Sequence, residues 1–447
     1  MIVTRPENNM TDPALCLSGR LGSLGPRVEA QVREYARVWS EAPSNPPHPR
    51  TIYPPRVKKE IEKEFSALID RVRIEHHKRL AARTGWETAD LEEIAADLRP
   101  FLKRILDRLD IPLAAVYDFR FLDSTRRFIR AARDFDPELR VDAVYQALRN
   151  VWIMNTLQLF LGREVGATKA IIGYSLVYPY LDNFLDDDRI SEPDKLALVI
   201  KLRRWLEGED GRAETGLEER LHALIDMIEG EFRREDYPGV YQSLLAIHNA
   251  QIKSLLQQRK RQSPDPVQIL DISLEKGGAS VLADGYLAAG KLEPAEEAFC
   301  FGLGTFLQLA DDLQDIAEDL RRGHITLFSQ AAGRKSLDPM LYKLLCFMSL
   351  TVERTLDESR PRERALKDVI IPGCALLYAE AAAKHPSYFS KGCLRSLAET
   401  FPVRFSYLKK LRRTLQDKFL AGGEKICDLD NFTIALMSLS SRAFALD

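Results

Sequence analysis

From about Val57 onward, apolar residues recur at the three- and four-residue spacing of an α-helix. The segment VKKEIEKEFSALIDRV, for example, places Ile61, Phe65, Leu68 and Val72 on one stripe. The segment DAVYQALRNVWIMNTLQLFLG is more apolar on all sides, as a central helix would be. Strand-type alternation is hard to find, and no glycine-rich phosphate loop follows a strand. The pattern predicts an all-α fold built as one large helical bundle.

A proline-rich stretch interrupts this pattern near the N-terminus. The segment EAPSNPPHPRTIYPPR holds six prolines between Pro43 and Pro55. Proline lacks a backbone donor and disfavours helix before it, so the stretch predicts an extended connector. We therefore expect an N-terminal extension with its connector over residues 1–55 and a helical domain over 56–447. The residues before the connector predict either a loosely ordered extension or a short helix that docks elsewhere.

Composition narrows the class of protein. The chain has 447 residues, a net charge of −2 and 45% hydrophobic residues, so no charge excess favours nucleic acid. Six scattered cysteines without metal-ligand spacing favour a reduced, cytoplasmic protein. No apolar run reaches the roughly 18 residues that a membrane span needs. Peripheral membrane contact stays open, since a helix containing KKLRR has a basic face.

Acidic residues cluster on one apolar segment, GLGTFLQLADDLQDIAEDLRRG. Asp311 and Asp315 are four residues apart and Asp319 follows one turn later, so a helix presents them on one face. Gln308 and Gly304 continue that face, and a glycine there lets another helix or a ligand approach closely. Like charges at this spacing repel, so a partly buried cluster needs a cation or raised pKa values.

A second acidic cluster lies earlier in the chain, in YSLVYPYLDNFLDDDRISEPDK. Asp182 and Asp186 are again four residues apart, with Asn183 between them. Tyr178 and Tyr174 lie one and two turns before Asp182. Two apolar helices thus each end in a group of carboxylates.

Carboxylate-rich clusters of this kind suit hard divalent cations. Mg²⁺ takes one or two protein carboxylates and completes its shell with water and phosphate oxygens. Two such helices facing each other would hold metal ions at the mouth of an apolar cavity, which predicts a substrate with a diphosphate head and a hydrocarbon tail. Acidic runs at helix ends also serve as solvated faces or caps, and Tyr174 and Tyr178 are equally compatible with a packed core.

Residues 152–328 resemble the class I isoprenoid-diphosphate enzymes, namely prenyl diphosphate synthases, squalene and phytoene synthases, and class I terpene synthases. DDLQD resembles the second aspartate-rich motif of prenyl diphosphate synthases, and DNFLD resembles the first with Asn183 in place of an aspartate. EKGGASVLADGYLAAG resembles the segment that carries their diphosphate-binding lysine, here Lys276. Compared with squalene and phytoene synthases, Asp315 and Asp319 would be the metal-side acids.

The resemblance implies a class I isoprenoid synthase-like bundle with a central apolar cavity, three Mg²⁺ ions and a prenyl diphosphate substrate; many relatives are homodimers. Two departures favour a terpene synthase, a lyase that ionises one allylic diphosphate and rearranges the cation. No GGKR-type segment precedes Asp182, and no RRG follows the first motif. A prenyltransferase, either chain-elongating or head-to-head, is the alternative. A non-catalytic helical regulatory subunit is the second alternative, which Asn183 supports because an amide would weaken a metal site.

The resemblance also assigns residues to roles, with Asp182, Asp186, Asp311 and Asp315 as the principal catalytic acids. The expected metal-side residues are Asp182, Asn183, Asp186, Asp311, Asp312, Asp315 and Asp319. The expected diphosphate-binding residues are Lys276, Gln308, Arg321 and Arg322. The expected substrate-pocket residues are Tyr174, Tyr178, Phe301 and Gly304. Arg321 and Arg322 would equally well complement the helix C-terminus before Gly323.

Overall fold

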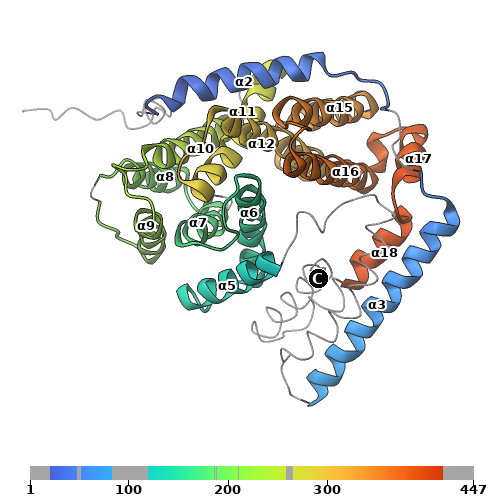
Figure 1. Cartoon of the computed structure of the whole chain (residues 1–447), viewed down its shortest axis with the longest axis horizontal. Coiled ribbons are helices and arrows are strands. Elements are labelled where there is room, and N and C mark those ends of the chain that lie inside the picture. The colour runs from blue at the N-terminus through green and yellow to red at the C-terminus, as the bar shows by residue number, and fades with distance from the viewer. Residues whose placement is uncertain are drawn as a thin grey trace, which may run out of the picture.

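The computed structural model is helical, and its described part contains no strand, which confirms the all-α prediction (Figure 1). It describes residues 21–47, 52–82, 119–185, 187, 189–209, 211–257 and 265–415. The helices are α2 (Leu24–Glu41), α3 (Pro55–Ala82), α5 (Phe119–Phe135), α6 (Val141–Phe160), α7 (Lys169–Leu185), α8 (Glu192–Leu206), α9 (Gly216–Glu229), α10 (Pro238–Gln257), α11 (Pro266–Ala289), α12 (Pro294–Gln314), α13 (Ile316–Arg322), α14 (Leu327–Ala331), α15 (Asp338–Thr355), α16 (Pro361–Lys384), the 3₁₀ turn η2 (Pro386–Tyr388), α17 (Lys391–Thr400) and α18 (Phe405–Leu415).

Helix α11 lies at the centre of the body, where it contacts α6, α7, α10 and α12 (Figure 1). Its approach to α12 is closest where Gly277 meets Gly304. A Cβ atom on Gly304 would lie 2.0 Å from the Gly277 carbonyl oxygen, and one on Gly277 would lie 2.3 Å from the Gly304 oxygen. Only glycine allows two backbones to come this close. Gly304 therefore allows close helix–helix contact. This is one of the two roles expected for it, the other being the close approach of a ligand.

Local sequence sets both the start of α11 and the turn that joins it to α12. Pro266 opens α11 behind Asp265, whose side chain accepts a hydrogen bond from the Val267 amide. Gly290 ends the helix with a φ of 75°, a conformation that favours glycine. The Glu296 side chain then accepts a hydrogen bond of 2.8 Å from the Glu293 amide at the start of α12. The short connection makes the two helices neighbours.

Helix α2 packs across α10, α11 and α15. Tyr35 donates a hydrogen bond of 2.6 Å to the Ala298 carbonyl, and Arg27 pairs with Glu297 at 3.1 Å. The apolar face of the helix, including Leu24 and Val38, is buried. The segment before the prolines thus contributes a docked helix to the body, while residues 1–20 lie outside the described part.

Helix α3 lies beside α17 and α18 at one side of the molecule (Figure 1). The buried Glu62 carboxylate accepts hydrogen bonds from the Arg404 guanidinium and from the Arg404 amide, the latter at 2.7 Å. Ser66 and Tyr407 share a hydrogen bond of 2.9 Å. The chain beyond the prolines therefore returns to pack on its C-terminal helices.

The described helices also bear on two expectations from composition. None of them is both long and apolar enough to cross a membrane. The cysteines in these ranges are free thiols, and Cys300, Cys374 and Cys393 are buried.

Candidate active site

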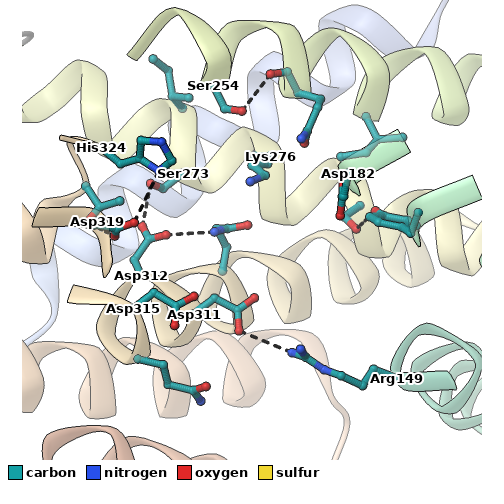
Figure 2. Close-up of a pocket in the computed structure, with 18 of the residues that line it drawn as sticks. Arg149, Asp182, Ser254, Ser273, Lys276, Asp311, Asp312, Asp315, Asp319 and His324 are labelled. Carbon is teal, nitrogen blue, oxygen red and sulfur yellow. Dashed lines mark hydrogen bonds and ion pairs between the residues drawn. The ribbon is translucent and has the colours of Figure 1, made fainter. Parts of the chain in front are cut away.

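A pocket of about 480 Å³, here called the acidic pocket, opens among α6, α7, α10, α11, α12 and the segment that follows α12. Figure 2 shows Asp182 on one side, the acids of α12 and α13 on the other, and Lys276 between them. Most of the metal-side and diphosphate-binding residues expected from the sequence line this pocket. These are Asp182, Asp311, Asp312, Asp315, Asp319, Lys276 and Gln308.

Asp311, Asp312, Asp315 and Asp319 form one side of the acidic pocket, here called the acidic wall. Hydrogen bonds hold the buried Asp312 carboxylate in this wall. Ser273 on α11 donates to one oxygen and Gln308 donates to the other, each at 2.9 Å. The side chain that the sequence assigned to diphosphate, Gln308, thus orients a neighbouring acid. Asp319 is also buried and accepts a hydrogen bond of 3.2 Å from Thr326. Asp312 and Asp319 are therefore fixed in place, which favours a preorganised site.

The acidic helix is interrupted at Asp315, where the sequence predicted a continuous run. α12 ends at Gln314 and α13 begins at Ile316. The Gln314 carbonyl accepts hydrogen bonds from Lys384 at 3.0 Å and from His385 at 2.7 Å, both at the end of α16. These side chains satisfy a carbonyl that would otherwise bond within the helix.

The opposite wall comes from α7 and α6. Asp182 accepts a hydrogen bond of 3.2 Å from Gln146 on α6. Arg149, one turn later on α6, lies 3.8 Å from Asp311 across the pocket. Sequence reasoning missed Gln146, Arg149 and Asn150. The signal was present, because three polar residues at i, i+3 and i+4, on a helix rich in apolar residues, mark one face for a different environment.

The environment of Asp311 raises the pKa of its carboxyl to about 6. Enclosure by the pocket wall is the largest cause, and repulsion from Asp312 and Asp315 adds to it. The positive charges of Arg149 and Lys276 oppose the shift. The sequence allowed a bound cation or raised pKa values for clustered acids, and the pKa of Asp311 is raised.

Asp319 has the same property. Burial raises the pKa of its carboxyl to about 7, and the charge of Asp312 adds to that effect while the Thr326 hydrogen bond opposes it. Burial also raises the pKa of Asp312, against the hydrogen bonds from Gln308 and Ser273. Ionisation of these carboxyls is therefore unfavourable near neutral pH. A divalent cation bound beside them would stabilise their ionised form.

The donor set of the acidic pocket fits Mg²⁺, because carboxylate oxygens are its preferred protein ligands. In the described part of the chain, no group of three or more His, Cys, Asp or Glu residues is already arranged to hold a metal ion. A magnesium ion bound by one or two carboxylates does not need such a group, since phosphate and water oxygens complete its shell. Asp182 and Asp311 are the residues that would hold ions from the two sides.

Several residues expected at the site do not line the acidic pocket. Asn183 is exposed. Arg321 and Arg322 are also exposed and pair with Glu318 at 3.2 and 2.8 Å, which matches their alternative role near a helix end. Phe301 is fully buried and stacks on Tyr35 at a ring separation of 5.9 Å. Local spacing could not distinguish these positions from pocket positions. Asp186 lies outside the described residues.

A second pocket of about 70 Å³, here called the apolar pocket, adjoins the first. The two share the lining residues Tyr178, Asp182, Ile247 and Gln251. The rest of the apolar pocket is lined by Tyr174, Val177, Leu181, Leu202, Leu206, Ile225, Ile228, Leu244 and His248. The carboxylates therefore lie next to a small, mostly hydrocarbon-lined space among α7, α8, α9 and α10.

The two tyrosines that the sequence placed in the substrate pocket both line this space. Their hydroxyls lie 3.3 Å apart, and the Tyr178 hydroxyl lies 2.9 Å from the Ser280 hydroxyl on α11. The rings of Tyr174 and Tyr178 meet edge to face at 5.4 Å. Because the two hydroxyl groups lie next to each other, the apolar ring surfaces of the tyrosines remain to line the apolar pocket.

Asp284 lies one turn beyond Ser280 on α11 and is fully buried. Neither of its carboxylate oxygens has a hydrogen-bond partner in the described part of the structure. Burial raises the pKa of this carboxyl well above its usual value, with the Asn150 amide opposing the shift. Burial therefore favours the neutral form of Asp284, and sequence reasoning gave no sign of this residue.

We expect Asp284→Asn to stabilise the protein by roughly 1–3 kcal/mol at pH 8, because burial disfavours ionisation of this carboxyl, which is ionised in the unfolded chain, whereas asparagine carries no charge. The carboxyl has a higher pKa in the folded than in the unfolded protein, so the wild type loses stability as pH rises above the unfolded value. Asparagine does not titrate, and the advantage should shrink toward pH 4. Urea unfolding at pH 8 and pH 4.5 measures both effects. The exposed Asp368→Asn is the control, and a pH-independent difference for Asp284→Asn would contradict the assignment.

Comparison of the chain with protein-family models, with curated proteins and with solved structures finds no match. The assignment of function therefore rests on the pocket chemistry and on the sequence motifs.

Proposed function

We propose that the protein is a Mg²⁺-dependent enzyme that ionises an allylic prenyl diphosphate, releases diphosphate and rearranges or cyclises the hydrocarbon cation. The observation that carries this proposal is the pairing of two acidic segments in one pocket. Asp182 and Asp311 are far apart in the chain, yet both line the acidic pocket, and an apolar pocket adjoins it. The acidic pocket, of about 480 Å³, has the size and polar lining for an anionic head group, and the adjoining apolar pocket, of about 70 Å³, gives room for the first part of a hydrocarbon tail.

The residues present support roles for each part of the substrate. Lys276 and Arg149 line the acidic pocket and can neutralise diphosphate oxygens. Lys276 forms no ion pair with the described residues, so its ammonium group is available for this contact. Bound Mg²⁺ would supply Lewis-acid stabilisation of the charge that develops on the departing oxygens. Asp182 and Asp311 would orient the head group between the two walls.

The apolar pocket supports the second half of the reaction. Its walls are mostly aliphatic side chains, with the faces of Tyr174 and Tyr178 beside them. Aliphatic walls exclude water that would capture a carbocation, and aromatic faces stabilise positive charge through their quadrupole. The hydrocarbon chain would enter from the shared wall at Asp182 and Ile247.

The test is to give the purified full-length protein geranyl, farnesyl or geranylgeranyl diphosphate with Mg²⁺, each with and without isopentenyl diphosphate. Diphosphate release and organic-extractable products are measured together, and a chelator is the control. We expect diphosphate release, with a hydrocarbon or terpene alcohol, from a single allylic substrate.

Two results would contradict this proposal. Longer diphosphates that form only with isopentenyl diphosphate would identify a chain-elongating prenyltransferase instead. Absence of diphosphate release from every allylic substrate, with the protein folded, would favour head-to-head coupling of two substrates or a non-catalytic regulatory subunit.

A further inference from the structure

His248 is a buried histidine in the wall of the apolar pocket. It lies on α10, one residue after Ile247, which lines both pockets. Its exposure is only 7%, and its Nε2 atom has no hydrogen-bond partner in the described part of the structure. A buried ring nitrogen usually bonds to another group, so an unpartnered one on a residue of a pocket wall is unusual and requires an explanation. An apolar side chain such as leucine would fill the same wall without leaving a buried polar atom unpartnered.

The imidazole of His248 is neutral at physiological pH. Burial lowers the pKa of the ring to about 4, and the nearby Arg203 guanidinium adds to the effect. Arg203 itself donates hydrogen bonds to Glu207 at 3.0 Å and to Asn249 at 3.3 Å, and these bonds hold its positive charge near the histidine. A neutral imidazole keeps one basic nitrogen, and no existing hydrogen bond at Nε2 has to break when the ring gains a proton.

The other polar groups that line the apolar pocket are poorer bases or are engaged elsewhere. Burial raises the pKa of Tyr174 and of Tyr178, so both hydroxyls stay protonated. Gln251 carries an amide, which is not basic. Asp182 lies at the wall shared with the acidic pocket and accepts a hydrogen bond from Gln146 there. His248 is therefore the neutral base that the described walls of this pocket offer to a hydrocarbon.

We propose that His248 is the catalytic base that ends the reaction by removing a proton from the hydrocarbon cation, an inference that rests on the proposed function. A C–H bond next to the cationic carbon breaks, and its electron pair forms a new C=C bond. The proton passes to the basic nitrogen of the imidazole, which becomes an imidazolium ion and returns the proton to solvent after the product leaves. No oxidant or reductant is needed, and the product is an olefin.

A weakened base suffices for this step. An alkyl cation with a neighbouring C–H bond is a far stronger acid than an imidazolium ion, so transfer to His248 is downhill even with its lowered pKa. The low pKa also keeps the ring unprotonated before the cation forms. The walls around it are mostly aliphatic, which limits the water that would capture the cation as an alcohol.

The experiment compares wild type, His248→Phe and His248→Gln with the allylic diphosphate that the wild type uses. Phenylalanine keeps a buried ring without a basic nitrogen, and glutamine keeps a polar side chain that takes up no proton. The readout is the product distribution per diphosphate released, because the step that forms the cation does not use His248 while the overall rate also depends on the shape of the pocket wall. The fraction of product that is the wild-type olefin should fall roughly 10-fold or more, with alcohols or other olefin isomers in its place.

The control is His222→Phe on α9, where the histidine is partly exposed, bonds to Asp226 and lines neither pocket. It should leave the product fractions unchanged. An unchanged olefin fraction in both His248 variants, with diphosphate still released and the fold intact by circular dichroism, overturns the role of His248 alone. No diphosphate release by the wild type from any allylic substrate overturns the proposed function and this inference with it. The two failures are thus distinguishable.

Discussion

We expect Asp311→Asn to lower diphosphate release by about 100-fold or more, because it removes negative charge where the departing diphosphate and its cation must be held. Asp311 lies 3.8 Å from Arg149 and beside Asp312 in the acidic wall. Asparagine has nearly the same shape and keeps one carbonyl oxygen, so the change tests charge rather than packing. Its neutral oxygen binds Mg²⁺ more weakly than a carboxylate does.

The measurement is the rate of diphosphate release across a Mg²⁺ titration. The Mg²⁺ concentration needed for half-maximal rate should also rise. Asp187→Asn is the matched control, because Asp187 follows the first acidic segment but pairs with Arg189 at 2.7 Å and does not line the acidic pocket. Wild-type rates in Asp311→Asn at every Mg²⁺ concentration would show that the acidic wall is not the site of ionisation.

The second large effect concerns the fold that builds the site. Gly304→Ala should lower the free energy of unfolding by about 3 kcal/mol or more, as expected for severe overpacking in a core. The added Cβ would lie 2.0 Å from the Gly277 carbonyl oxygen and 3.0 Å from the Gly278 Cα. These are backbone atoms, so the clash is relieved only when α11 and α12 move apart. The same movement would separate Ser273 from Asp312, which are bonded across that interface.

Denaturant unfolding measures the change in stability, and Gly373→Ala supplies the control. Gly373 lies within α16, where a Cβ would meet no atom within 4 Å. Alanine is the better helix former by about 1 kcal/mol, so Gly373→Ala should be neutral or stabilising. Equal stability of Gly304→Ala and wild type would show that the interface accepts a side chain there.

Much of the candidate site could be predicted because the signals are local. A carboxylate every fourth residue on an apolar helix predicts one charged face, whatever the rest of the chain does. Spacing placed Asp311, Asp315 and Asp319 on one helix face, and all three line the acidic pocket. Asp182 and Lys276, which the family resemblance assigned to the same site, line it too. The same local periodicity was enough to predict an all-helical chain.

Residues whose roles depend on a partner from elsewhere could not be assigned in this way. Arg321 and Phe301 had suitable chemistry and spacing, yet one pairs with Glu318 at the surface and the other packs on Tyr35 from α2. Arg149 joins the site only because α6 lies across the pocket from α12. Nothing in the sequence around these residues encodes which neighbour they meet.

The sequence by itself determined which segments are helices and which of their faces carry carboxylates, because periodicity depends on residues a few positions apart. Only the tertiary structure decided that Asp182 and the acids of α12 and α13 share one pocket, that Gln314 bonds to α16 and breaks the acidic helix, and that His248 faces an apolar pocket. Burial, pKa and enclosure are set by side chains from distant helices. They therefore appear only when those helices pack together.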